Sequence, residues 1–243
     1  MNADLQLALE LADMSDAITL RSFRKSFSVR TKADRTPVSD VDEAVEQAIR
    51  DRLDRERPED SIVGEEFGKR GDSSRRWIID PIDATRNYIR GIPIFATLIA
   101  LDDVLGVVSA PALTRRWWAV RGEGAMCDGH PIRVSSVGSF EDAQLGYDSI
   151  TDFPASEKFL TLLRRCGRAR GFGDFWIHML VAEGAIEIAA EPQVAWWDMA
   201  AVQVIVEEAG GRFTTFAGQA RSDGGSAISS NGLLHDEVLA ALR

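Results

Sequence analysis

The chain has 243 residues, of which 45% are hydrophobic and 27% charged, as is ordinary for a water-soluble globular protein. This length suits one large domain or two small ones. The formal net charge of −10 argues against a nucleic-acid-binding protein, which would need a basic surface stripe. It does not exclude an anionic small substrate, because a bound metal ion can invert the local field.

Cysteine content and apolar patterning bear on the compartment. Cys127 and Cys166 lie far apart and form no C-x-x-C pair, which indicates a reducing compartment and gives no sign of a zinc site. The N-terminus lacks the basic and apolar regions of a signal peptide. The longest strongly apolar stretch, residues 95–101, is too short to span a bilayer. We therefore expect a cytoplasmic protein that has no membrane partner.

Apolar periodicity divides the chain into two parts with different patterns. In residues 1–135 we expect two amphipathic helices followed mostly by strands, and in residues 136–243 alternating helices and strands. The predicted helices span residues 4–25, 39–56, 156–165, 174–183, 198–209 and 233–242. The predicted strands span residues 61–64, 77–79, 95–101, 104–110, 117–121, 186–190 and 227–229, with a loop at 68–76 and a hairpin at 126–134. We expect the two parts to pack as one compact unit.

The stretch from Trp77 to Asn87 carries the strongest chemical signal. Its apolar beginning predicts a buried strand, which delivers Asp80 and Asp83 into a turn. Pro81 should end the strand, because proline has a fixed φ and no N–H. Carboxylates and a hydroxyl at a strand end suit Mg²⁺, which prefers oxygen ligands. An Asx-turn with two solvated acids is the alternative interpretation.

Three other predicted element ends also supply acids. Asp42 follows Ser39 in a capping-box pattern, Asp198 begins a predicted helix, and Glu65 follows a short strand. Each acid therefore has a structural alternative, as a helix cap or a solvated loop residue. Taken together, the acids could hold two divalent cations, which requires about five carboxylates. Such a pair can bridge a phosphate and activate a water molecule.

Three motifs in order carry a family resemblance: Gly64-Glu65-Glu66, Asp80-Pro-Ile-Asp83-Ala-Thr85 and Trp197-Asp198-Met-Ala-Ala201. They resemble the signatures of the inositol monophosphatase superfamily of Mg²⁺-dependent, lithium-sensitive phosphomonoesterases. The resemblance implies an α/β (α+β) fold, a five-layer αβαβα sandwich, and commonly a homodimer.

The resemblance also implies a role for each motif residue. Glu65, Asp80 and the Ile82 carbonyl would hold one Mg²⁺, Asp80, Asp83 and Asp198 a second, and Glu65 would help to bind a weaker third. Mn²⁺ is a possible substitute. Asp42 and Thr85 would activate the attacking water with Glu65 as the third catalytic residue, and the N–H groups of Ala84 and Thr85 would bind phosphate. The family usually has glycine at position 84, so we expect retained but altered activity, with strain if φ is positive there.

Further stretches are similar to the actinobacterial type of histidinol-phosphate phosphatase, namely residues 86–93, 107–112, 115–118, 171–176, 181–185, 189–192 and 230–238. This resemblance implies hydrolysis of L-histidinol phosphate to L-histidinol and phosphate, a step of histidine biosynthesis. Asp174, Glu191 and Asp198 would then bind substrate, since carboxylates suit a cationic leaving group. Trp176 and Trp196 could stack on the imidazole. Alternatively, Asp174 caps its helix and the tryptophans belong to the core.

Two other functions stay open. An inositol-1-phosphate phosphatase would share the chemistry and would also use an acid at Glu191, so this residue does not separate the substrates. A regulatory protein associated with RNA or a polymerase is disfavoured by the acidic charge balance. None of His130, His178 and His235 lies in a family motif, so we expect no catalytic histidine.

Overall fold

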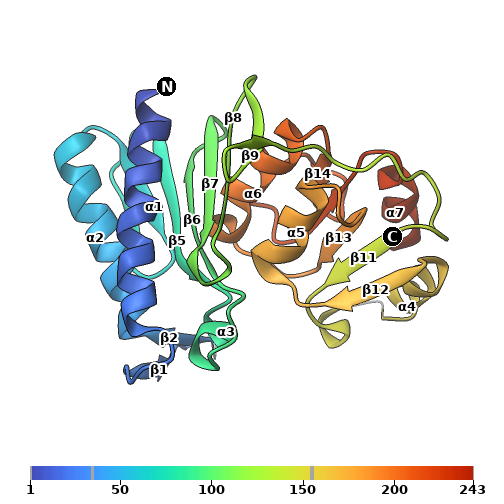
Figure 1. Ribbon diagram of the computed structural model, residues 1–243, viewed down its shortest axis with the longest axis horizontal. Helices are drawn as coiled ribbons and strands as arrows, with labels where there is room; N and C mark the ends of the chain where they lie inside the picture. The colour runs from blue at the N-terminus through green and yellow to red at the C-terminus, as the bar shows by residue number, and fades with distance from the viewer. Residues whose placement is uncertain (1, 34–35, 154–155, 243) are drawn as a thin grey trace.

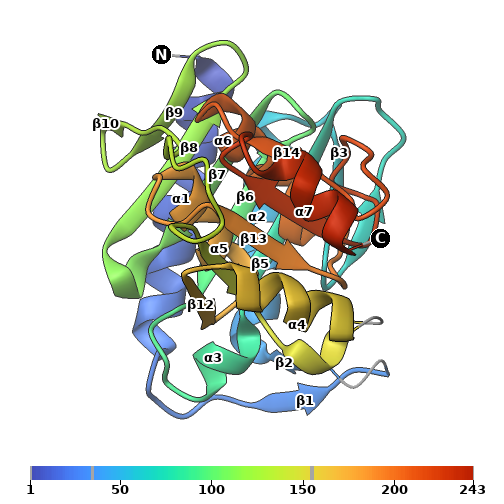
Figure 2. The same cartoon turned by 90° about the vertical axis from the view of Figure 1, so that its right-hand side faces the viewer.

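The computed structural model describes residues 2–33, 36–153 and 156–242. Two large sheets alternate with three layers of helices, seen edge-on in Figure 1 and from the side of the second sheet in Figure 2. The expected five-layer αβαβα sandwich is therefore confirmed. Within the described residues, no helix combines the length and the apolar character needed to cross a bilayer.

The first outer layer consists of α1 (Ala3–Ser22) and α2 (Asp40–Glu56), which cover one face of an eight-stranded sheet. The strand order is β10-β9-β8-β7-β6-β5-β3-β4. The strands are β3 (Ser61–Gly64), β4 (Gly68–Arg70), β5 (Arg76–Asp83), β6 (Ala96–Leu101), β7 (Leu105–Ala110), β8 (Arg115–Val120), β9 (Gly124–Cys127) and β10 (His130–Pro131). The predicted antiparallel meander (β6, β7, β8) and the hairpin at Asp128-Gly129 are confirmed. However, β4 forms inside the predicted loop 68–76, where it pairs with β3.

The central layer consists of α5 (Asp174–Ala182) and α6 (Trp196–Glu208), which lie between the two sheets. A helix enclosed on both sides must be apolar all round. Accordingly, α6 buries consecutive residues from Met199 to Val202 and from Val204 to Val206. The contact with β7 is a backbone contact, because a Cβ at Gly106 would lie 2.5 Å from the Ala201 carbonyl oxygen.

The second sheet has the order β12-β11-β13-β15-β14, and α4 (Ser156–Arg165) and α7 (His235–Leu242) form the outer layer beyond it. Its strands are β11 (Gln144–Tyr147), β12 (Arg168–Gly171), β13 (Ile188–Glu191), β14 (Arg212–Thr214) and β15 (Ala227–Ser230). Three of these, β11, β12 and β14, were not predicted. The two sheets draw on separate parts of the chain, but the division at residue 135 stays a prediction.

The course of β5 differs from the prediction at Pro81. The strand does not end there but continues to Asp83. Asp80 pairs with Leu98 and Asp83 with Ala96, so β5 uses one residue more than β6 across this interval. This β-bulge places Pro81 where no ladder N–H is needed. The bulge also changes the direction of the acids. Residues i and i+3 of a regular strand point to opposite faces of the sheet, but the extra residue of the bulge brings Asp80 and Asp83 to the same side.

Two smaller elements lie near this bulge. A two-stranded antiparallel sheet pairs β1 (Val29–Thr31) with β2 (Pro37–Ser39) immediately before α2. The short helix α3 (Thr85–Ile89) follows β5. The β1–β2 sheet, the start of α2 and the helix α3 therefore lie near the end of β5, where most of the predicted site residues lie.

Candidate active site

Three carboxylates from the eight-stranded sheet and the central layer form the centre of the site. One oxygen of each of Asp80, Asp83 and Asp198 lies within 4.8 Å of the others. The β5 bulge supplies the two former residues, and the first turn of α6 supplies Asp198. The α6 helix begins at Trp196, so the interpretation of Asp198 as the N-cap is wrong. Asp198 instead accepts the Ala195 N–H at 2.7 Å, which fixes the side chain at the third helical position.

Burial and mutual repulsion make this cluster electrostatically costly. Burial, followed by the neighbouring carboxylates, raises the pKa of Asp80 and of Asp83 well above the usual range. Burial likewise raises the pKa of Asp198 to about 7. Asp80 Oδ1 is buried and has no hydrogen-bond partner among the described residues. A buried, all-oxygen set with surplus negative charge and an unpartnered acceptor fits a hard divalent cation.

Glu65 lies at the edge of the cluster and is paired with a residue that sequence analysis missed. Lys32, in the segment between β1 and β2, places Nζ 2.6 Å from Glu65 Oε1 and 2.7 Å from Glu66 Oε1. Burial works against the charged form of this ammonium, but the two hydrogen bonds outweigh it and raise the pKa of Lys32. The lysine therefore stays charged and offsets part of the acidic surplus. Lys32 and Glu65 are 33 residues apart in the sequence, so no local motif could predict that they form a pair.

Glu46 on α2 explains the glycine of the Gly64-Glu65-Glu66 motif. Its buried carboxylate accepts the N–H groups of Glu66 at 2.7 Å and Phe67 at 3.1 Å. A Cβ at Gly64 would lie 2.1 Å from Glu46 Oε1, so only glycine leaves room for this contact. Glu46 thus packs against the backbone at Gly64 and holds the turn that carries Glu65.

Asp42 is a helix cap whose carboxylate also contacts Thr85, while its role in activating water stays a prediction. It completes the capping box of α2, where its Oδ2 accepts the N–H of Ser39 at 2.8 Å. Its other oxygen, Oδ1, lies 3.2 Å from Thr85 Oγ1, which is also 2.9 Å from the Ile82 carbonyl oxygen. Burial raises the pKa of Asp42 to about 6. The cap therefore fixes the carboxylate that faces the threonine hydroxyl.

Ala84 has a positive φ, the conformation in which alanine is expected to be strained where the family has glycine. Its φ of 64° and ψ of 45° are left-handed, and it is the N-cap of α3. A Cβ makes this region costly for residues other than glycine. The expected strain is therefore present. The first N–H groups of a helix have no intrahelical acceptors, so those at the start of α3 are available as donors.

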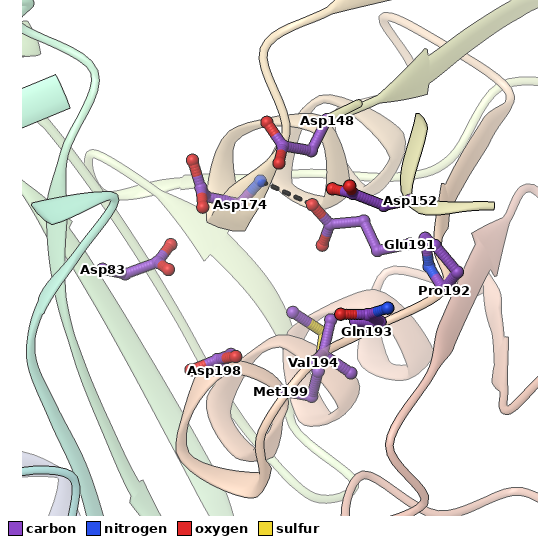
Figure 3. A pocket seen from close by; sticks show the side chains of 10 residues that line it. All are labelled: Asp83, Asp148, Asp152, Asp174, Glu191, Pro192, Gln193, Val194, Asp198 and Met199. Atoms are coloured by element: carbon purple, nitrogen blue, oxygen red, sulfur yellow. Dashed lines mark hydrogen bonds between the residues drawn. The ribbon is translucent and has the colours of Figure 1, made fainter. Parts of the chain in front are cut away.

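An acidic pocket adjoins the metal-ligating candidates (Figure 3). Its carboxylates come from β5, α5, α6, β13 and the segment after β11, and none of the described residues that line it is basic. The lining residues are Asp83, Asp148, Asp152, Asp174, Glu191, Pro192, Gln193, Val194, Asp198 and Met199. Asp83, Asp174, Glu191 and Asp198 were predicted to lie in the site. Asp148 and Asp152 were missed, because they follow a four-residue strand that has no recognisable pattern.

Asp174 differs from the alternative given for it, whereas the two tryptophans pack against the core, as their alternative held. The N-cap of α5 is Gly173, and the Asp174 carboxylate makes no cap bond; its N–H donates to Glu191 Oε1 at 2.7 Å. Trp176 packs against Trp117, with ring centroids 6.0 Å apart. Trp196 lies under the Arg76 guanidinium at 4.9 Å. Neither tryptophan is among the described residues that line the pocket, and stacking on an imidazole stays a prediction.

Comparisons with known proteins agree with this geometry. A model of the Inositol monophosphatase family matches residues 2–243. The chain belongs to this family. A histidinol-phosphatase of Mycobacterium tuberculosis is 50% identical over 98% of this chain and 97% of its own, and one of Streptomyces coelicolor is 48% identical over 98% and 96%. The solved structure of an IMPase of Thermotoga maritima superposes with a TM-score of 0.90 at 31% identity, over 98% of this chain and 96% of the other. Family membership confirms the resemblance, and the family is metal-dependent.

The strain at Ala84 gives a prediction about stability. Ala84→Gly should raise the free energy of unfolding by about 1 kcal/mol, since glycine adopts this φ without a Cβ clash. Urea unfolding measures the change. The control Ala44→Gly, in the interior of α2 and exposed, should lower stability by about 1 kcal/mol. A loss of stability in both variants would contradict the assignment of strain.

The raised carboxyl pKa values predict a pH dependence for the metal-free protein. Glu191, with a pKa raised by burial to about 8, and Asp198 keep protons that the unfolded chain has lost. Between about pH 6.5 and pH 8.5 the folded state thus binds more protons, so stability should fall as pH rises, by about 1.4 kcal/mol per pH unit for each excess proton. Below this window the buried His178 and His235, whose pKa values burial lowers to about 3 and about 4, act in the opposite direction.

Urea unfolding in EDTA across this window tests the sign. A saturating divalent cation should restore stability most strongly at the upper end, because its ligands must be deprotonated. Stability that rises with pH in EDTA, or that does not respond to the cation, would contradict the assignment of these carboxylates as a metal site.

Proposed function

We propose that this protein is a Mg²⁺-dependent phosphomonoesterase that hydrolyses L-histidinol phosphate to L-histidinol and phosphate in histidine biosynthesis. The observation that carries the proposal is the acidic pocket beside the metal-ligating candidates. The identity of about half over nearly the whole of two histidinol-phosphatases supports the same substrate. We further propose that the protein is a homodimer, as the family resemblance implies, and that it is cytoplasmic, which its two free cysteines support.

The charge of the pocket favours a cationic leaving group. L-histidinol carries an ammonium group and an imidazole, whereas inositol is neutral. Six carboxylates line the pocket, and burial raises the pKa of Asp174 and Glu191, a cost that a bound cation would offset. A substrate with a second phosphate would need basic groups, and none lines the described part of the pocket. Glu191 alone does not separate histidinol phosphate from inositol phosphate, but the added Asp148 and Asp152 increase the preference for positive charge.

The metal assignment follows the donor atoms. We propose that Glu65, Asp80 and the Ile82 carbonyl hold one Mg²⁺ and that Asp80, Asp83 and Asp198 hold a second, with a weaker third ion at Glu65 and Mn²⁺ as a substitute. Only oxygen donors are present, which suits these hard ions. When bound, the ions would neutralise phosphoryl charge and lower the pKa of a bound water.

Asp42 and Thr85 would orient and deprotonate the attacking water. The Thr85 hydroxyl has one proton, which it can donate to Asp42 Oδ1 at 3.2 Å while its own oxygen accepts a hydrogen bond from water. As the water attacks phosphorus, its proton passes to Thr85 and that of Thr85 to Asp42. A carboxylate with a pKa near 6 is a suitable general base near neutral pH.

The remaining groups would bind phosphate and release the products. The N–H groups of Ala84 and Thr85, at the start of α3, would bind phosphoryl oxygens. The phosphorus–oxygen bond of the ester breaks as the bond to water forms, and a second water protonates the leaving alkoxide. No covalent phosphoenzyme is required.

Phosphate release in Mg²⁺ tests the substrate. The kcat/KM for L-histidinol phosphate should exceed that for inositol-1-phosphate by about tenfold or more, or about 1.4 kcal/mol of transition-state binding. The reverse ratio would make the protein an inositol-1-phosphate phosphatase. Activity on neither ester would overturn the proposal as a whole.

Substitution of the shared carboxylates tests the site. Asp80→Asn and Asp198→Asn should each abolish turnover and metal-induced stabilisation. The folded state should survive, because removing one negative charge relieves repulsion in the metal-free cluster. Asp103→Asn, at an exposed acid that pairs loosely with Arg121, is the control and should keep full turnover. An unchanged rate in Asp80→Asn or Asp198→Asn would exclude the metal assignment.

A further inference from the structure

His178 is the one histidine of the described chain that contacts a pocket carboxylate. It lies on α5, one turn after Asp174, and is completely buried. Its Nε2 is 3.0 Å from Glu191 Oε2, and its Nδ1 is 2.7 Å from Ser229 Oγ. Glu191 and Ser229 lie on the paired strands β13 and β15, so the second sheet and the central layer meet at this histidine.

The protonation of His178 decides what it can do. Burial lowers its pKa to about 3, so the imidazole is neutral and carries a single N–H. When the Ser229 hydroxyl donates to Nδ1, the proton of the ring must be on Nε2, which then donates to Glu191. A neutral donor orients the carboxylate and adds no charge of its own. A lysine or arginine in this place would instead cancel a negative charge on Glu191.

Glu191 is consequently held on both oxygens. Oε2 accepts the His178 N–H, and Oε1 accepts the Asp174 N–H at 2.7 Å, as the dashed line in Figure 3 shows. The backbone approaches closely from the α5 side, since a Cβ at Gly173 would lie 2.4 Å from Oε1. An ionised carboxylate has about four acceptor positions, so each oxygen keeps one for a ligand in the pocket.

We propose that His178, with its tautomer set by Ser229, is a positioning residue that orients Glu191 as the acceptor for the cationic part of the leaving group, whose binding favours the ionised carboxylate. The inference rests on the proposed function, because it concerns recognition of the leaving group of that reaction. It assigns His178 and Ser229 to selectivity and not to the chemical step.

His235 provides an internal comparison. It is equally buried, and hydroxyl groups lie at both of its ring nitrogens, Thr214 Oγ1 and Ser230 Oγ, each at 2.8 Å. Two hydroxyls therefore suffice to satisfy a buried imidazole in this fold. At His178 one of the two partners is instead a carboxylate that lines the pocket.

A matched pair of variants tests the proposal in the Mg²⁺-loaded protein. The glutamine amide nitrogen in His178→Gln reaches the place of Nε2 and keeps the donor to Glu191, whereas the shorter side chain in His178→Asn reaches the place of Nδ1 and loses it. The readouts are kcat and KM for L-histidinol phosphate and for glycerol 2-phosphate, whose leaving group is neutral. His178→Asn should raise KM for the former by about tenfold, and at least about fivefold more than for the latter. His178→Gln should restore KM to within about threefold of the wild type.

The other variants make each outcome decisive. Ser229→Ala, which keeps the imidazole, should raise KM selectively by about threefold, and it serves if His178→Asn does not fold. His235→Asn should change both substrates alike. Equal effects of His178→Asn on both esters, or equal effects of the Asn and Gln variants, would overturn the inference. If the wild type does not prefer L-histidinol phosphate, the proposed function fails instead, so the two failures are distinguishable.

Discussion

Repulsion among buried carboxylates is the constraint on which the site depends. Asp80, Asp83 and Asp198 place oxygens within 4.8 Å of one another, and Glu65, Asp174 and Glu191 extend the negative charge to either side. Burial raises the pKa values of the central acids because ionisation there has no solvent to support it. The chain offsets this cost only in part, with the Lys32 ammonium and with single backbone donors to Asp83 and Asp198. The metal dependence of the family follows from this imbalance, since divalent cations supply the missing positive charge.

The layered fold brings these acids together through rigid elements. The bulge in β5 turns Asp80 and Asp83 to one side, and α6, enclosed between the two sheets, brings Asp198 against them. The β5 strand is paired on both sides, with β3 and β6, and α6 is in backbone contact with β7 at Gly106. A small error in ligand position would weaken both metal binding and catalysis. Placing the acids on a strand and a helix in the core, and not on mobile loops, is therefore a condition of the chemistry.

The sequence predicted the acids better than their surroundings. Asp42, Asp80, Asp83 and Asp198 were identifiable because each lies in a short motif at the end of a periodic segment, and the layer order followed from the family resemblance. Lys32 and Glu46 could not be identified, because each acts through a partner that is distant in the sequence, and Asp148 follows a short strand without a recognisable pattern. The continuation of β5 through Pro81 was missed because only pairing with β6 reveals the bulge. The sequence left the tryptophans open between pocket and core, because it gives residue type but not the direction of a side chain.

The two halves of the site face different parts of the proposed substrate, one the phosphoryl group and the other the leaving group. In the proposed function, the half built from Asp42, Asp80, Thr85 and Asp198 would bind a phosphoryl group that is the same in every ester, so its demands are charge and position. The other half would distinguish leaving groups. A wrong leaving group is rejected when it leaves charges of the site unpaired, and the correct one is favoured by the contacts that it makes. A carboxylate selects a cation only if it stays ionised and correctly oriented in a buried place. A neutral imidazole between Glu191 and Ser229 meets the second condition, since it donates a hydrogen bond and adds no charge, and a bound cation would favour the ionised form.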